Sequence, residues 1–352
     1  MVQRYQAQPW ASGGRWHRVN SFALGIRSGI ERRVRGAARR LHGFAQSAPR
    51  PVILMYHRVA QESFDPWGTT VTPARFAEQL AWMICDRKIL PLAEFAARKL
   101  EGTLPDNAIA LTFDDGYSCN AEVAAPMLER FRATATFFLT IDAIEKSRAF
   151  WWDELEEIVL GHDGPTLALD GEQVSLGERR GDDRRWRPNS APRTPRQRAY
   201  YELQRKLVTR KPAEIERAMS ELRSQTRAAA NPAKRPMAPE DVRRIAGSLI
   251  DFGSHSLTHP WLTSLSAAEK AAEIRESAEA CAALTGSRPR TFAYPFGDFD
   301  EESRRLAEEA GYDCACSTDS AAVGSESPQF ALPRVQVGNW SARRLQRALR
   351  EL

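Results

Sequence analysis

Short apolar runs that alternate with amphipathic helical patterns constrain the fold of this chain more than any other feature. The runs are rich in β-forming residues and occupy 52–56, 108–113, 135–140, 249–253, 291–294 and 313–317. Helical patterns occupy about 73–86, 121–131, 267–285 and 301–310. Strands that alternate with helices indicate a parallel sheet or barrel. We therefore predict an α/β fold.

Length and composition limit the other possibilities. The chain has 352 residues, 42% of them hydrophobic, which is enough for one large domain or two modest ones. Because no run of about 18 apolar residues occurs and the N-terminus is polar, we expect neither a transmembrane helix nor a signal peptide. Five widely spread cysteines do not indicate a disulfide framework. These features predict a cytoplasmic protein.

Charge is unevenly distributed along the chain. Residues 1–50 contain ten arginines and one glutamate, and residues 178–235 contain seventeen basic and seven acidic residues. Because the net charge of the whole chain is only +5, the remainder is acidic. We expect 1–50 to be a basic, partly disordered leader. Such a leader could meet anionic lipid headgroups, nucleic acid or an acidic substrate, or remain a solvated tail.

A segment from 161 to 236 interrupts the alternation of strands and helices. It contains a predicted hairpin at 167–176, an Arg/Pro-rich stretch and a charged helical pattern at about 194–229. We interpret it as an insertion in a domain that spans 51–340 and is followed by a C-terminal helix at 341–352. The insertion could cover an active site or bind a partner.

Two adjacent carboxylates end the apolar run at 108–113, where the sequence at 112–116 is Thr-Phe-Asp-Asp-Gly. Active sites of parallel α/β folds form at the carboxyl ends of the strands. Neighbouring strand residues point to opposite sides, so Asp114 and Asp115 serve one site only where the chain turns. Gly116 permits that turn. The structural alternative is an Asp-Gly turn after an edge strand.

Two histidines follow another predicted strand. His255 and His259 lie within Gly-Ser-His-Ser-Leu-Thr-His-Pro, at 253–260. If the chain turns helically there, the two imidazoles lie one turn apart on one face, which is a metal-chelating spacing. Two imidazoles and one carboxylate suit a catalytic zinc ion. The alternative is one core histidine and one capping histidine.

A third segment, Arg-Thr-Phe-Ala-Tyr-Pro-Phe-Gly, occupies 290–297. Its Pro295 and Gly297 imply a specific turn. In this order, the three segments resemble the polysaccharide deacetylases with the NodB homology domain, which form carbohydrate esterase family four. The resemblance covers about 51–160 and 237–336. It implies a distorted barrel of about seven β/α units, here interrupted by an inserted hairpin-plus-helix segment.

The resemblance also implies a ligand set and a base. Asp115, His255 and His259 would bind a divalent metal, with Zn2+ preferred and Co2+, Mn2+ or Ni2+ as alternatives. Asp114 would act as the general base. The physical demands of amide hydrolysis agree, because water must be made nucleophilic and the oxyanion must be stabilised.

Three further roles complete the implied mechanism. The backbone N–H of Tyr294 would contribute to the oxyanion site, and Arg290 would orient and tune Asp114. Many family members supply a general acid from a Leu-x-His motif near the C-terminal end, but this chain has Leu-Pro-Arg at 332–334. His57, just past the first strand, resembles the acid of permuted members and is our candidate. A structural histidine bonded to the backbone is the alternative.

The substrate-binding residues are less defined by the sequence. The fourth family motif is an Asp near the end of a later strand, for which Asp319 is the first candidate and Asp313 the second. Trp151 and Trp152 are adjacent aromatic residues that could form a sugar-stacking wall or pack in the core.

Together these observations predict a metal-dependent hydrolase that removes N-acetyl groups from amino sugars of a polysaccharide or lipid-linked glycan precursor. Alternatives are a deformylase or amidase on another C–N substrate, and a non-catalytic glycan-binding scaffold. A cytoplasmic enzyme would meet its substrate at the inner membrane face, where the leader could contact anionic lipid. A nucleic-acid partner ranks last, because only the basic segments favour it.

Overall fold

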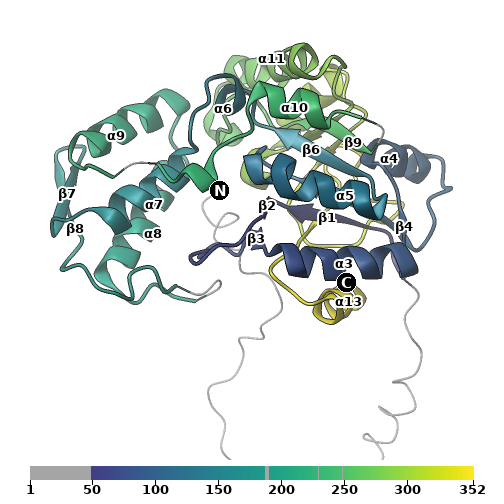
Figure 1. Ribbon diagram of the computed structural model, residues 1–352. Coiled ribbons are helices and arrows are strands. Elements are labelled where there is room, and N and C mark those ends of the chain that lie inside the picture. Colours follow the sequence, from purple (N-terminus) through teal and green to yellow (C-terminus); the bar gives the residue numbers. More distant parts are fainter. Residues whose placement is uncertain (1–48, 187–189, 229, 248) are drawn as a thin grey trace, which may run out of the picture.

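The structure is a computed structural model, which describes residues 49–186, 190–228, 230–247 and 249–352. Figure 1 shows a half-barrel of strands and helices with a smaller lobe beside it. Of the predicted leader, only residues 49 and 50 lie within the described residues. Among the helices that are described, none combines the length and the apolar character needed to span a membrane.

A curved parallel sheet forms the centre of the half-barrel. Its strands lie in the order β11-β10-β9-β6-β5-β1-β12, and the short strand β4 (Lys88–Ile89) pairs with the start of β5. The other strands are β1 (Val52–Tyr56), β5 (Ala108–Phe113), β6 (Ala135–Leu139), β9 (Ile250–Ser254), β10 (Thr291–Ala293), β11 (Cys314–Cys316) and β12 (Val335–Gln336). The predicted parallel α/β fold is therefore confirmed.

The last segment of the sheet nearly closes it into a barrel. Leu332 forms a parallel bridge with Cys316 of β11, and Val335 pairs with Leu54 of β1. Residues 332–336 therefore contact β11 at one edge of the sheet and pair, as β12, with β1 at the other side. This curvature brings the carboxyl ends of the first and last strands to the same end of the half-barrel.

Both faces of the sheet are buried, which explains why its strands read as continuous apolar runs. In β1, Leu54 and Tyr56 contribute to the large core beneath the outer helices, whereas Ile53 contributes to a second cluster. In β5, Leu111 and Phe113 belong to the large core, and Ala110 belongs to the second cluster. The alternation is that of a two-sided strand.

Helices cover the outside of the sheet (Figure 1). They are α3 (Pro73–Asp86), α4 (Leu92–Leu100), α5 (Ala125–Phe131), α6 (Ile141–Glu145), α10 (Pro239–Ile245), α11 (Ala267–Thr285), α12 (Glu301–Glu309) and α13 (Ala342–Arg350). The sequence encodes several of their ends. Thr72 caps α3, whose first residue is a proline, and a Ser266–Glu269 capping box starts α11, which Gly286 ends at φ 81°.

The predicted helix at 121–131 is divided in the structure. Its first part, η3 (Asn120–Ala124), is a π-helical turn, and α5 continues it. Asn120 is fully buried at this turn, and its side-chain amide donates to the backbone carbonyl of His57 at 2.8 Å. A two-stranded parallel pair, β2 (Arg58–Val59) and β3 (Thr70–Val71), lies beside the turn.

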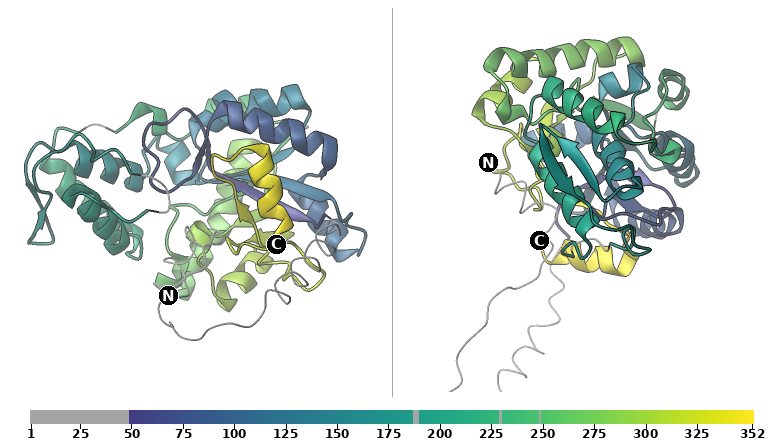
Figure 2. Two further views of the ribbon diagram at one scale, coloured as in Figure 1. Left: turned by 90° about the horizontal axis from the view of Figure 1, so that it is seen from below. Right: turned by 90° about the vertical axis from the view of Figure 1, so that its left-hand side faces the viewer.

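The lobe consists of α7 (Trp151–Gly161), β7 (Thr166–Leu169), β8 (Glu172–Ser175), α8 (Pro195–Leu207) and α9 (Pro212–Ser224). Figure 2 shows that it projects from the half-barrel to one side. The predicted hairpin is confirmed, since β7 and β8 are antiparallel. Asp170 and Gly171 both have positive φ, 56° and 78°, as a type I′ turn requires.

Two features of the lobe differ from the sequence prediction. The prediction of a single helix at about 194–229 is wrong, because the segment forms two helices, α8 and α9. Pro212 starts the second helix and disfavours helical geometry at Lys211. The lobe also includes α7, which precedes the predicted insertion. Leu155 and Ile158 of α7 pack against Leu203 of α8 and Leu222 of α9 in a core separate from that of the sheet.

Candidate metal centre and active site

The two adjacent acids lie where β5 ends and the chain turns. Asp115 and Gly116 adopt left-handed backbone geometry, with φ of 73° and 84°. This turn allows both carboxylates to serve one site, as the sequence required. Gly116 is also sterically needed, since a Cβ there would lie 3.1 Å from Ile144 and 3.3 Å from Leu139.

The histidines are brought together by an irregular turn, not by the helical turn that we expected. Ser256 and His259 have positive φ values of 66° and 59°, and the Ser256 hydroxyl accepts the His259 N–H at 3.0 Å. A carboxylate from α11 braces this loop, because Glu273 accepts the N–H groups of Leu257 and Thr258 at 2.9 and 3.0 Å.

Three potential ligand atoms converge at this point. The Nε2 atoms of His255 and His259 lie 3.2 Å apart, and Asp115 Oδ1 lies 3.5 and 3.3 Å from them. Ligands that bind zinc tetrahedrally at about 2.0–2.1 Å lie about 3.3 Å from one another. The residues therefore fit a single divalent ion. These three side chains form a potential metal-binding group in the described part of the chain, and all are buried.

The protonation states also suit a metal. Burial opposes ionisation of Asp115, but hydrogen bonds from His255 and His259 outweigh it and hold its pKa far below the usual range. Burial lowers the pKa of His259, which favours the neutral imidazole. His255 Nδ1 lies 2.7 Å from the carbonyl oxygen of Ala293, which fixes the ring and directs Nε2 toward the centre.

Asp114 is paired with an arginine that sequence reasoning did not select. The guanidinium of Arg334 donates to both oxygens of Asp114, each at 2.7 Å, and to Thr112 Oγ1 at 3.1 Å. Its Nε donates to the carbonyl oxygen of Ser317 at 2.9 Å. Burial opposes ionisation of Asp114, but Arg334 and His255 outweigh it and lower the pKa of this carboxyl.

Comparison with known families agrees with this geometry. The family model described as polysaccharide deacetylase matches residues 101–163 and 210–315, which include Asp114, Asp115, His255 and His259. The chain contains a polysaccharide deacetylase domain. The residues between the two matched parts, 164–209, contain the hairpin, the basic stretch and all of α8 in the lobe.

Relatives of the deacetylase domain support the same fold. The Bacillus subtilis (strain 168) protein YxkH, provisionally named a polysaccharide deacetylase, is 26% identical over 104 residues. The match covers 30% of this chain and only 37% of YxkH. The Streptococcus pyogenes deacetylase PplD, solved with acetate, superposes with a TM-score of 0.55 at 17% identity. The superposition covers 86% of this chain and 99% of the PplD chain.

A third similar structure is IcaB from Ammonifex degensii, with a TM-score of 0.53 and 15% identity. That superposition covers 86% of this chain and 97% of IcaB. At these identities the likeness is one of fold. It confirms the parallel sheet curled into a half-barrel that the deacetylase domain shows.

The structure contradicts two of the predicted residue roles, those of Arg290 and Tyr294. Arg290 precedes β10, at the end of the sheet opposite Asp114, where its exposed side chain pairs with Asp313 at 2.5 Å. Tyr294 does not offer a free backbone donor, because its N–H bonds to the carbonyl oxygen of Cys316 at 3.2 Å. That bond continues the β10–β11 ladder, so the predicted oxyanion role is not available to this N–H.

His57 lies beside the paired acids. Its charge would lower the pKa of both Asp114 and Asp115, which places the imidazole near both carboxylates. Its Nδ1 is buried and has no hydrogen-bond partner among the described residues. The position agrees with the predicted role as general acid, which stays a prediction. Asp319, by contrast, is exposed after β11, and its carboxylate accepts from Ser317 at 3.2 Å.

The tryptophan pair reaches the metal centre through one member. The Trp152 ring centroid lies 4.8 Å from that of His259, and its Nε1–H donates to the hydroxyl of Tyr117 at 2.8 Å. Trp151 and Trp152 both line a cavity of about 260 Å³ that His259 also borders. The predicted substrate-wall role of the pair is therefore compatible with their position.

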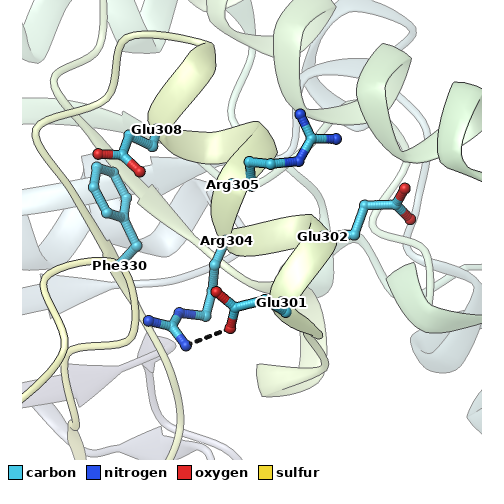
Figure 3. Close-up of a pocket in the computed structure, with 6 residues that line it drawn as sticks. All are labelled: Glu301, Glu302, Arg304, Arg305, Glu308 and Phe330. Carbon is cyan, nitrogen blue, oxygen red and sulfur yellow. Dashed lines mark hydrogen bonds and ion pairs between the residues drawn. The ribbon is translucent and has the colours of Figure 1, made fainter.

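A larger hollow of about 420 Å³ lies along α12 (Figure 3). Its lining is Glu301, Glu302, Arg304, Arg305, Glu308 and Phe330, and Figure 3 shows Arg304 paired with Glu301. Because none of the predicted site residues lines it, this charged hollow is not part of the candidate active site.

Proposed function

We propose that the domain is a metal-dependent hydrolase that removes N-acetyl groups from amino sugars of a polysaccharide or lipid-linked glycan precursor. The observation that carries the proposal is the convergence of Asp115, His255 and His259 beside the Asp114–Arg334 pair. A metal-binding triad next to a fixed, ionised carboxylate is the arrangement that hydrolysis of an amide needs.

Each residue has a distinct task in this proposal. A divalent ion held by Asp115 and the two histidines would acidify water and polarise a carbonyl group. Asp114, held at both oxygens by Arg334, takes a proton from the attacking water. His57 lies on the same side and returns a proton to the leaving amine, which would otherwise depart as a poor leaving group.

The first experiment measures metal content. We expect about one Zn2+, Co2+, Mn2+ or Ni2+ ion per wild-type chain by elemental analysis, and its loss in His255→Ala. His162→Ala, which changes a histidine at the end of α7, is the matched control and should retain the ion. A wild-type chain without metal, and without uptake when divalent ions are added, would refute the mechanism.

The second experiment concerns the acyl group. Side-by-side hydrolysis of N-acetylated sugars, N-formylated sugars and cyclic ureides, each measured by release of its product, separates the deacetylase from the deformylase and amidase alternatives. We expect acetate release to dominate, and to disappear in Asp114→Asn. Retained metal with hydrolysis of none of the three substrates would favour a glycan-binding scaffold.

The basic leader supports a further proposal about location. Arg50 Nη1 donates to the carbonyl oxygen of Leu352 at 2.8 Å, so the leader joins the domain beside α13. Four arginines of α13 are exposed there, at 343, 344, 347 and 350. We propose that this basic region contacts an anionic membrane on its cytoplasmic face, where lipid-linked precursors are accessible.

Vesicle co-sedimentation tests this proposal. Deleting residues 1–48 should weaken binding to vesicles that contain phosphatidylglycerol, and raised salt should weaken binding of the full chain. Uncharged phosphatidylcholine vesicles are the control. Unchanged binding after the deletion would rule out the leader as the membrane contact.

A further inference from the structure

A cavity of about 260 Å³ separates the lobe from the half-barrel, directly beside the candidate metal centre. The half-barrel side of its lining includes His259 and Thr258 from the histidine loop, together with Thr140 after β6. The lobe side consists of residues of α9 and the start of α7. The lobe therefore builds a wall of the cavity that the half-barrel alone would lack.

The cavity has an apolar side and a polar side. Trp151, Trp152, Ile215 and Met219 provide aromatic and aliphatic surface. Trp152 is held in place by its bond to the Tyr117 hydroxyl, and its ring contacts both His259 and Phe296, with centroids 4.8 and 5.9 Å away. Flat apolar surfaces of this kind pack against the C–H faces of sugar rings.

The acidic groups on the polar side are already paired. Glu216 of α9 bonds to Arg148 and also to Arg223, the latter at 2.6 Å. Glu154 lies 2.9 Å from Arg223, and Asp142 lies 2.5 Å from Lys146. The cavity therefore offers hydrogen-bonding groups without an unpaired positive charge in its lining. The lining contains three carboxylates, Asp142, Glu154 and Glu216, and one cation, Arg148, so a carboxylated or phosphorylated ligand would be disfavoured.

Two buried polar groups in the lining have no protein partner. Trp151 Nε1 and Thr140 Oγ1 are buried and make no hydrogen bond among the described residues. A buried donor without a partner is unfavourable, by about 1–3 kcal/mol. Neither atom is open to the cavity, so ligand hydroxyl or amide oxygens would satisfy these groups only after the side chains turn toward it.

We propose that this cavity is a subsite for one uncharged N-acetylated pyranose unit, and that α9 of the lobe determines its specificity. The proposal rests on the hydrolase function proposed above, whose metal centre borders the cavity at His259. The lobe then selects glycans whose unit next to the metal carries no acidic substituent.

A blocking substitution tests the location of the subsite. Ala213 lines the cavity from the first turn of α9 and is itself exposed, so Ala213→Trp adds bulk without disrupting the core. Ala81→Trp adds the same bulk to the exposed face of α3, on the half-barrel, and is the matched control. Both are made in the Asp114→Asn background, which prevents turnover.

Isothermal titration with an oligomer of N-acetylglucosamine gives the readout, with metal content measured on each variant. We expect Ala213→Trp to raise Kd by roughly tenfold or more, which is equivalent to about 1.4 kcal/mol of binding free energy. Ala81→Trp should bind as the parent does. Both variants should retain the metal. Equal binding by the two variants, or no binding by the parent, would overturn the proposal.

A second variant tests the selection against charge. Glu216→Gln removes one carboxylate from the wall and leaves Arg148 without its partner. We expect binding of glycans with N-acetylmuramic acid, which carries a carboxylate, to improve relative to the uncharged oligomer. An unchanged ratio would contradict the role of α9 in specificity. Failure of the hydrolase proposal is seen separately, as absent metal uptake, and would leave glycan binding in the cavity measurable.

Discussion

The Arg334 guanidinium reaches Asp114 from the far end of the chain and holds both carboxylate oxygens. Both side chains are almost completely buried, with exposed fractions of 0% and 3%. A buried pair of this kind gains stability only when its hydrogen bonds are satisfied, and here Thr112 and Ser317 complete those of Arg334. The pair therefore fixes the orientation and the charge of the proposed base together.

Removing the arginine should affect both stability and pH dependence. Arg334→Gln leaves a buried carboxylate without its cation, which should lower the free energy of unfolding by about 3–5 kcal/mol in chemical denaturation at neutral pH. Arg334 lowers the pKa of Asp114, so the stability that it provides is present at neutral pH and is lost as the pH falls. In Arg334→Lys, the acidic limb of kcat/KM should move to higher pH.

Arg290→Gln is the matched control for these measurements. Its side chain is exposed at the opposite end of the sheet and pairs with Asp313, so both the unfolding curve and the pH profile should remain those of the wild type. If Arg290→Gln shifted the acidic limb and Arg334→Lys did not, the assignment of Arg334 as the positioning residue of Asp114 would be wrong.

At the scale of elements, a buried charge cluster joins α7 to the turn η4 (Pro232–Lys234). Lys234 Nζ lies 2.7 and 2.8 Å from the two oxygens of Glu156 and 3.7 Å from Asp153. One ammonium therefore faces two carboxylates. Burial raises the pKa of Glu156 to about 7 despite Lys234, whereas the two carboxylates together outweigh burial and raise the pKa of Lys234.

This cluster predicts a pH-dependent stability. Because the pKa of Glu156 rises from 4.5 to about 7 on folding, its contribution to stability is full at low pH and is lost as the pH rises through about 7. Glu156→Gln cannot ionise. Relative to the wild type, its free energy of unfolding should therefore increase by on the order of 2–3 kcal/mol between about pH 5 and pH 8. Urea unfolding at both pH values measures this difference, and a difference independent of pH would contradict the assignment.

Local signals made most elements predictable from the sequence. Apolar runs marked the strands, amphipathic patterns marked the helices at 73–86 and 267–285, and Asp170-Gly171 marked the hairpin. Each signal depends on residues close together in the chain. The break before Pro212 was also encoded locally, but the charged pattern on both sides obscured it.

Contacts between distant segments were not predictable in the same way. His255 and His259 could be grouped because their spacing indicates a metal, and the family resemblance added Asp115 to them. Arg334 lies 220 positions from Asp114 and forms part of no metal-binding pattern, so only the closure of the sheet reveals the pair. Arg290 illustrates the opposite error. It was assigned to the site because it lies within a motif, but it precedes β10 and therefore lies at the other end of the sheet.

At the scale of the whole molecule, the lobe projects from the half-barrel (Figure 2) and has a hydrophobic core distinct from the large core of the sheet. Residues of both parts line the cavity beside His259. The core of the half-barrel contains Leu111 and its neighbours on the sheet, and the core of the lobe contains Leu203. Because the metal-binding residues come from the half-barrel, their geometry depends on the first core. Apart from Trp152, which packs on His259, the lobe contributes only to the cavity wall, so we expect that it can lose order without dispersing the metal ligands.

Matched core substitutions test this division. Leu203 is 4% exposed and Leu111 is fully buried, so replacing either with alanine should destabilise its own core by about 2–5 kcal/mol. In hydrogen-exchange mass spectrometry, Leu203→Ala should accelerate exchange across 151–225 while β1, β5 and β6 stay protected and the metal stays bound. Leu111→Ala should accelerate exchange in the sheet and weaken metal retention. Uniform acceleration in both variants would instead show that the two cores unfold as one cooperative unit, and that the lobe cannot open independently of the metal centre.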